Sequence, residues 1–208
     1  MKHVLMLAML LSSTCSFAQL AKGNLQLGGS LSYTNQKNDQ YDYYPGLPYS
    51  IKSTSFALSP RAGLFFSDKS VVGLSLSFTS TTNTSEFSGL DKNQSKNSLF
   101  SITPYYRHYK SLGEHAAFFF QGDASIGFGK YKPEGASYDT FYYGVGVRPG
   151  VALFLSEKWA LEATYGSLSY QSTKYTPDGS DNNRTSNSFG LNLNWLTLAF
   201  GVQYFIAR

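Results

Sequence analysis

A hairpin-like segment that recurs three times places the strongest constraint on this chain. The copies span Pro60–Phe78, Pro104–Phe120 and Pro149–Tyr165. In each copy a proline lies seven residues before the serine that begins a short polar turn, at Ser67, Ser111 or Ser156, and successive prolines are 44 and 45 residues apart (104 − 60 and 149 − 104). Self-similarity at a fixed period indicates a repeated supersecondary unit. Alternating apolar residues on both sides of a tight turn predict that this unit is a β-hairpin.

The first 18 residues have the features of a secretory signal peptide. Lys2 and His3 precede the apolar run Val4–Leu11, and Ser16–Ala18 forms a small-x-small cleavage site. This run is too short to span a membrane. We therefore expect residues 1–18 to be removed and residues 19–208 to form one domain. Cys15, the only cysteine, lies in the leader, so the predicted mature chain has no disulfide and no cysteine chemistry.

Composition excludes several classes of protein. The chain has 16 Tyr, 16 Phe and 19 Gly but only 14% charged residues, and its basic residues are scattered. Scattered basic residues give no reason to expect a nucleic-acid partner, although the sequence pI is about 9.0. After the leader, no apolar run approaches the length of a membrane helix. Of the two folds that cross membranes, this leaves the β-barrel.

The remaining sequence alternates between about eight strands and connections of two lengths. Three short turns follow the repeated prolines, and the longer polar loops are predicted at 36–51, 83–97, 131–140 and 171–187. Outer-membrane barrels have an even number of strands, short periplasmic turns and longer extracellular loops. We therefore predict an all-β fold, an eight-stranded antiparallel transmembrane β-barrel in an up-and-down meander. The stretch before Trp195 is out of phase with the last strand, which suggests a bulge there.

Counting back from the turn serines assigns the two faces of the barrel. Positions an odd number before each serine are apolar and are expected to face lipid, whereas the even positions are small, polar or charged and are expected to face the lumen. Five charged residues fall on the lumen side: Arg61, Arg107, Arg148, Asp123 and Glu162. They could form a charged constriction along an ion path or a buried salt-bridge network. The network is favoured, because an eight-stranded barrel is only wide enough for side chains and buried charges persist when paired.

Other residues on the strands have structural interpretations. The repeated prolines remove ladder donors and predict a regular local distortion near the periplasmic rim. Aromatic girdles are expected at the two membrane interfaces. Their predicted members are Phe66, Tyr106, Trp159 and Tyr204 on the periplasmic side, and Tyr33 and Tyr143 on the outer side.

No residues form a recognisable catalytic, cofactor or metal site. The mature chain has two histidines, His108 and His115, which flank one short turn without a placed carboxylate partner. The segment Asp178–Asn183 resembles a calcium loop but lacks the bidentate glutamate, and its residues are those that turns select. We therefore predict no catalytic residues, no cofactor and no metal.

With these residues in hand, the chain resembles the outer-membrane β-barrel domain family, the small OmpA/OmpX-like eight-stranded barrels of the kind common in Bacteroidetes. The similarity covers the mature chain and is strongest in Pro60–Lys69, Pro149–Lys158 and the closing strand LTLAFGVQYFIAR. That strand resembles a C-terminal assembly signal, with Gly201, Val202, Tyr204 and Ile206 as its expected elements, although it ends in Ile-Ala-Arg instead of Phe.

The resemblance implies an integral outer-membrane protein but no single activity. Its implied partners are outer-membrane lipid, lipopolysaccharide and the outer-membrane assembly machinery. We expect a structural or surface-interaction role, with an unidentified extracellular partner bound by the four long loops. The alternatives are a narrow porin-like channel for small solutes or ions and, less favoured, a lipid-modifying enzyme.

Overall fold

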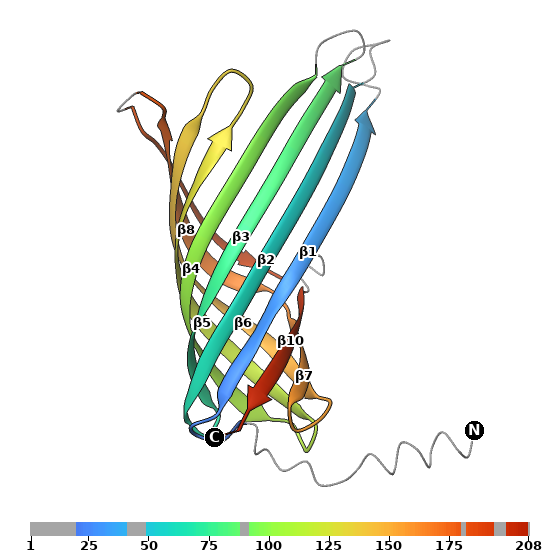
Figure 1. The fold of residues 1–208 in the computed structure, drawn as a ribbon, viewed down its shortest axis with the longest axis vertical. Helices are drawn as coiled ribbons and strands as arrows, with labels where there is room; N and C mark the ends of the chain where they lie inside the picture. Colours follow the sequence, from blue (N-terminus) through green and yellow to red (C-terminus); the bar gives the residue numbers. More distant parts are fainter. Residues whose placement is uncertain (1–19, 41–48, 88–91, 180–181, 194–198, 208) are drawn as a thin grey trace, which may run out of the picture.

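The chain folds into long antiparallel strands that wrap into a barrel (Figure 1). A computed structural model describes residues 20–40, 49–87, 92–179, 182–193 and 199–207. The strands are β1 (Leu25–Gln40), β2 (Tyr49–Ser67), β3 (Ser70–Phe87), β4 (Asn93–Ser111), β5 (Ala116–Lys132), β6 (Tyr138–Phe154), β7 (Trp159–Thr164), β8 (Ser167–Pro177), β9 (Arg184–Asn192) and β10 (Ala199–Ile206). Among the described residues, no helix is long and apolar enough to cross a membrane.

Eight of these strands close into a ring. The hydrogen-bonded order is β5-β4-β3-β2-β1-β10-β7-β6, and β6 pairs again with β5. Strands β8 and β9 continue the wall beyond β7 and β10. β8 pairs with the first part of β6, from Tyr138 to Val147, and β9 pairs with β8. The predicted all-β, eight-stranded antiparallel meander is confirmed. The ten assigned strands arise because the seventh predicted strand is divided into β7 and β8 and the eighth into β9 and β10.

A one-residue bulge divides the seventh strand. Gly150 pairs with Thr164 and Val147 pairs with Leu168, so three steps along β6 face four steps along the other strand. The extra residue falls at the β7–β8 junction, where Gly166 has a φ of 72°. Such a bulge moves the outward face from odd to even positions.

The eighth strand is described in two parts, β9, which ends at Asn192, and β10, which begins at Ala199. Thr164 pairs with Ala199 and Ser167 pairs with Asn192. Three residue steps along the seventh predicted strand therefore face seven steps along the eighth. The outward residues accordingly change from odd positions in β9 to even positions in β10. The sequence predicted such a phase change near Trp195, but residues 194–198, which include Leu196, Leu198 and Trp195, lie outside the described residues.

Among the described residues, the upper part of the barrel wall lacks one pairing. β1 pairs with β10 only from Leu25 to Gly29, and from Ser30 onward it pairs with β2 alone. β9 pairs with β8 alone, and all nine of its residues are exposed. In the described part of the chain, the upper half of β1 and the whole of β9 are therefore sheet edges.

The predicted loop boundaries were wrong, because the strands extend beyond them. β1 reaches Gln40, and β2 starts at Tyr49, inside the loop predicted at 36–51. In the same way, β3 and β4 occupy most of 83–97, β5 and β6 shorten 131–140, and β8 and β9 shorten 171–187. The extensions contain Ser, Thr, Asn, Lys and Tyr on both faces, so the period-two apolar signal disappears. The backbone ladder nevertheless continues, and Thr and Tyr favour strands.

The repeated prolines interrupt the ladder at equivalent places. Pro60 and Pro104, each with its preceding residue, are skipped in the pairing with the next strand, but the register is the same on both sides of the gap. Pro149 is skipped in the same way, and there the register does shift, beside the β7–β8 bulge. At the first gap the Ser75 hydroxyl donates a hydrogen bond to the Pro60 carbonyl at 3.2 Å. This side-chain bond satisfies one acceptor beside the gap.

An apolar belt covers the outside of the barrel. On β5 it extends from Phe118 to Phe128, ten residue steps, or about 33 Å along the strand at roughly 3.3 Å per residue. A strand tilt near 40° reduces this to a height of about 25 Å, which is the apolar band of outer-membrane barrels. Below the belt, near the short turns, the rings of Trp159 and Tyr204 are 4.8 Å apart, and those of Phe66 and Tyr106 are 6.1 Å apart.

The two ends of the barrel differ in their connections. The turns after β2, β4 and β6 lie at one end, which we call the turn end, together with the start of β1 and the end of β10 (Figure 1). The opposite end, which we call the loop end, contains the extended hairpins β1–β2, β3–β4, β5–β6 and β8–β9. Figure 1 draws the turn end at the bottom, so "lower" and "below" mean toward the turn end, and "upper" and "above" mean toward the loop end.

Candidate functional site: the barrel interior

The centre of the site is a buried carboxylate between two arginines. Glu162 on β7 forms an ion pair with Arg61 on β2 and a second with Arg107 on β4, in which Nη1 and Oε2 are 2.7 Å apart. Arg107 has no exposed surface and Glu162 is 4% exposed. Strands that are far apart in sequence meet here only because the ring closes. Glu162 is thus the counter-charge of both arginines, and its removal would leave two buried cations unpaired.

A glutamine connects this centre to the other predicted ion pair. Arg107 donates from Nε and Nη2 to Gln121 Oε1, at 3.1 and 2.7 Å, and Gln121 Nε2 donates to Asp123 Oδ2 at 3.0 Å. Asp123 in turn forms an ion pair with Arg148 at 2.9 Å. The structure thus brings all five charged residues named from the sequence into one connected network. Gln121, which joins them, was missed, although it is an amide at an inward position of its strand.

The network extends downward through a tyrosine. Arg107 Nη1 donates to the Tyr109 hydroxyl at 2.9 Å, and Gln26 Nε2 donates to the same oxygen at 2.7 Å. The guanidinium carbon of Arg107 also lies 4.0 Å from the centroid of the Phe119 ring, a distance at which the ring face attracts the cation. These contacts satisfy most of the donors of a fully buried arginine, which offsets the cost of burying it.

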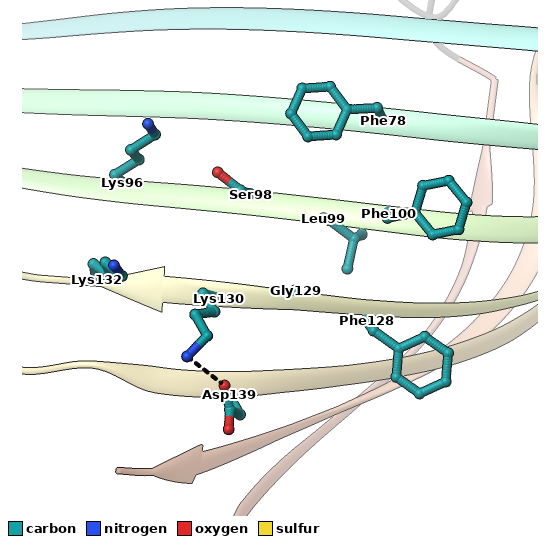
Figure 2. Close-up of a pocket in the computed structure, with 10 residues that line it drawn as sticks. All are labelled: Phe78, Lys96, Ser98, Leu99, Phe100, Phe128, Gly129, Lys130, Lys132 and Asp139. Carbon is teal, nitrogen blue, oxygen red and sulfur yellow. Dashed lines mark ion pairs between the residues drawn. The ribbon is translucent and has the colours of Figure 1, made fainter.

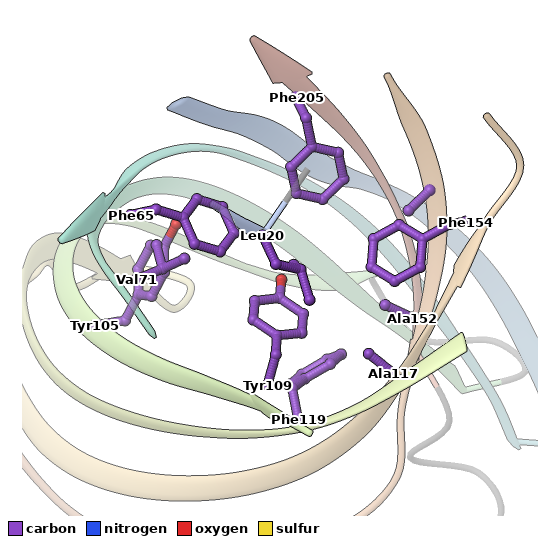
Figure 3. Close-up of a cluster of buried hydrophobic side chains, with 11 residues drawn as sticks. Leu20, Phe65, Val71, Tyr105, Tyr109, Ala117, Phe119, Ala152, Phe154 and Phe205 are labelled. Carbon is purple, nitrogen blue, oxygen red and sulfur yellow. The ribbon is translucent and has the colours of Figure 1, made fainter. Parts of the chain in front are cut away.

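An aromatic plug fills the lumen below the network (Figure 3). Its members are 0–5% exposed, and they are Leu20, Phe65, Val71, Tyr105, Tyr109, Ala117, Phe119, Ala152, Phe154, Ala160 and Phe205. The expectation that inward positions are small, polar or charged was therefore wrong near the turn end. Large rings are stable there because they pack on one another: Phe65 lies 6.0 Å from Tyr109, and Phe154 lies 5.9 Å from Phe205.

The same threefold repeat contained a signal for this plug. Phe65, Tyr109 and Phe154 each lie two residues before a turn serine, so each hairpin places one ring at the same height. The residues before β1 complete the plug from below. The Leu20 carbonyl accepts from Lys69 N at 2.9 Å, and Gly23 N donates to the Phe65 carbonyl at 2.8 Å. These bonds hold the 2% exposed Leu20 side chain under the rings.

The lumen is more polar and more open above the network. A pocket of about 150 Å³ borders Asp123 and Arg148, and Arg148 has a side chain that is 42% exposed. At the loop end, a larger pocket of about 610 Å³ is lined by Thr81, Asn83, Asn97, Tyr131, Pro133, Tyr138, Tyr175 and Arg184. The interior thus changes from apolar at the turn end, through the charged network, to polar and aromatic at the loop end.

The other candidate residues are dispersed. His108 Nδ1 lies 3.0 Å from the Ser70 hydroxyl near the turn end, and His115 accepts a backbone bond from Phe154 through its carbonyl. Within the described ranges, no three His, Cys, Asp or Glu residues are grouped to hold a metal ion. Two members of the calcium-like segment, Ser180 and Asp181, lie outside the described residues.

The C-terminal strand places its expected assembly-signal residues at defined positions. Val202 and Ile206 are exposed on the outer face, and the Tyr204 ring packs on Trp159. Gly201 points inward, where an added Cβ would lie 3.0 Å from both Arg61 Nη2 and Glu162 Oε1. Glycine at this position therefore leaves room for the central ion pair. The role of these residues in assembly stays a prediction.

Comparisons with known proteins agree with this architecture. Residues 4–207 match the family described as "Outer membrane protein beta-barrel domain". The fold is similar to the crystal structure of the outer membrane protein OprG from Pseudomonas aeruginosa, with 15% identity, a TM-score of 0.50, and coverage of 91% of this chain and 99% of that chain. Neisserial surface protein A gives 14% identity, a TM-score of 0.44, and coverage of 88% and 99%.

No curated protein sequence matches the chain. The family match nevertheless spans nearly all of it, and the ring of strands is the architecture that the family name describes. The chain is therefore a Gram-negative outer-membrane protein and belongs to the outer membrane protein β-barrel domain family.

Proposed function

We propose that this protein is a barrel without an open pore, with a structural or surface-interaction role and with its loop end outside the cell. The observation that supports it is the filling of the lower lumen. Arg107 in the charged network and Tyr109 and Phe119 in the aromatic plug have no exposed surface, and Arg107 contacts both of these rings. An eight-stranded barrel has little more interior than its side chains need, so this filling supports a lumen without a continuous aqueous path.

The surface-interaction part of the proposal rests on the loop end. The extended hairpins hold Tyr131, Tyr138 and Tyr175 around one pocket, with Arg184 beside them. Tyrosine and arginine are enriched where proteins bind partners, because they combine apolar area with hydrogen-bonding groups. The unidentified extracellular partner would bind these hairpins, which correspond to the shortened loops at 36–51, 83–97, 131–140 and 171–187.

The alternative is a narrow channel for small solutes or ions. It is favoured by one observation, the polar pocket that borders Asp123 and the partly exposed Arg148. A solute that enters from the loop end would meet the network before the plug.

Planar-bilayer recording of the refolded barrel distinguishes the two. We expect no stable conductance from the wild type. A steady conductance that changes in Arg107→Ala or Glu162→Ala, but not in Lys110→Ala on the outer face, would contradict the closed barrel and establish the channel.

We also propose that the protein is not an enzyme. His108 and Ser70 form the one serine–histidine contact in the described part of the chain, and no carboxylate that orients the imidazole accompanies it there. A nucleophile–base pair normally needs such a third group. Phospholipid hydrolysis that is lost in Ser70→Ala would overturn this assignment.

A further inference from the structure

The outer face of the barrel has a cleft that combines lysines with phenylalanines (Figure 2). It has a volume of about 570 Å³ and extends across β3, β4, β5 and β6. We call it the lysine–phenylalanine cleft, and the residues that define it are Lys96, Lys130, Lys132, Phe78, Phe100 and Phe128. Strand register places all six side chains on the outward face of the wall.

The phenylalanines form the upper edge of the apolar belt. Phe78 pairs with Phe100 and Phe100 pairs with Phe128 across three neighbouring strands, and all three are about half exposed. The ring of Phe128 lies 5.3 Å from that of Phe141 on β6. This row of rings offers a continuous apolar surface to acyl chains.

The lysines lie immediately above the rings. Lys130 is two residues beyond Phe128 and Lys132 is four, which places their Cα atoms about 7 and 13 Å further along the strand. This is the level at which the apolar part of a lipid gives way to its head group. A lipid whose phosphate contacts these lysines would therefore have its acyl chains on the phenylalanines.

The charged residues that line the cleft do not balance one another. Lys130 pairs with Asp139 at 3.3 Å, but Lys96 and Lys132 have no ion-pair partner in the described part of the chain. Among the residues that line the cleft, three lysines and one carboxylate leave a local charge of +2 (3 − 1), and Glu86 on β3 is paired with Lys92 at 3.2 Å.

Two of these lysines also lie directly opposite each other. Lys96 pairs with Lys132 in the β4–β5 ladder. Like charges in this position repel and destabilise a sheet, and an anion between the two ammonium groups would remove the repulsion. A phosphate accepts hydrogen bonds from several lysines at once.

We propose that the lysine–phenylalanine cleft binds a phosphorylated glycolipid of the outer leaflet, with its phosphate on Lys96 and Lys132 and its acyl chains on Phe100 and Phe128. The proposal requires the loop end to face outward, and it does not depend on whether the lumen conducts.

Native mass spectrometry of the detergent-extracted barrel, titrated with lipid A, tests the site. We expect lipid A to bind the wild type, and the affinity to fall about tenfold or more in Lys96→Gln/Lys132→Gln, since each lysine near an anionic surface contributes about 1 kcal/mol. Lys96→Arg/Lys132→Arg should keep binding. The matched control is Lys110→Gln/Lys158→Gln, which removes two exposed lysines at the turn end and should bind like the wild type.

Three outcomes would overturn the proposal. One is equal binding of lipid A by Lys96→Gln/Lys132→Gln and by the wild type, when both proteins still change their gel mobility on heating and are therefore folded. Another is an equal loss in the turn-end control, which would show only a general effect of charge. The third is equal binding of dephosphorylated lipid A, which lacks the phosphate, or stronger binding of phosphatidylglycerol, which carries its phosphate on a glycerol lipid and not on a glycolipid.

Discussion

The turn-end half and the loop-end half of this barrel are held together by different interactions. At the turn end, the ring is closed by the β1–β10 pairing, and the lumen is filled by aromatic side chains and a shared carboxylate. At the loop end, β1 and β9 are sheet edges in the described residues, and the interior is a polar pocket lined by tyrosines. The comparison indicates that stability is concentrated in the lower half.

The two halves also impose different demands on the sequence. Along the apolar belt, one face of each strand meets lipid and the other faces the lumen, so the sequence has to alternate. Beyond the belt, water satisfies the backbone, and both faces of a hairpin can be polar. This difference explains why the outward lysines and the upper tyrosines are available for the binding that we propose, whereas the lower residues pack against one another.

The largest expected effect of a single substitution is at Glu162. Glu162→Gln leaves Arg61 and Arg107 buried without their counter-charge, and breaking a buried ion pair costs about 3–5 kcal/mol. We expect the free energy of unfolding to fall by about that amount in a urea titration of the refolded barrel, followed by gel mobility.

The matched control for Glu162 is Asp139→Asn, which breaks the exposed Lys130–Asp139 pair on the outer face. Exposed pairs contribute about 0–1 kcal/mol, so this variant should unfold like the wild type. Equal losses in the two variants would refute the view that the lower half is the stable one.

A smaller effect is expected from Leu20, which closes the plug from below. Leu20→Ala removes a buried side chain and should cost about 2–3 kcal/mol in the same titration. Leu31→Ala on the upper half of β1 is the comparison, because that leucine is 70% exposed and its removal should cost less than about 1 kcal/mol. If Leu31→Ala proved the more damaging of the two, the plug would not be the main source of stability.

The smallest effect is local and concerns the amides of β1. From Leu25 to Gly29 the strand is paired on both sides, whereas from Ser30 to Gln40 its only partner within the described ranges is β2. Hydrogen exchange measured by NMR should therefore show slow amides throughout the lower part. Along the upper part, every second amide should exchange roughly 100-fold faster, because those groups face the unpaired edge. Uniform protection along β1 would show that its upper half is paired in solution.

The threefold hairpin repeat predicted a large part of this structure. The alternation of residues before Ser67, Ser111 and Ser156 predicted the outward and inward faces. The three turns that begin at these serines were predicted to lie at one end of the barrel, as they do. It therefore predicted the antiparallel meander and placed the five charged residues on the lumen side. The interior aromatic rings at Phe65, Tyr109 and Phe154 were present in the same repeat but were not interpreted as a plug.

The extents of the strands could not be predicted in the same way. Alternation reports burial on one face, and the upper hairpins are polar on both, so the boundaries at 36–51, 83–97, 131–140 and 171–187 were placed too far inside the strands. The divisions of the seventh and eighth strands depend on the register between neighbouring strands. The sequence suggested only one of them, through the phase change near Trp195.

The sequence by itself determined which side chains face inward, because the two-residue period of a strand is a local property of the backbone. Only the tertiary structure decided which of them meet. Glu162 reaches Arg61 across 101 positions and Arg107 across 55, and Gln121 joins that centre to Asp123 and Arg148. Those contacts depend on the relative height of strands around a closed ring. That height is set by the stagger between distant strands, and no local pattern contains it.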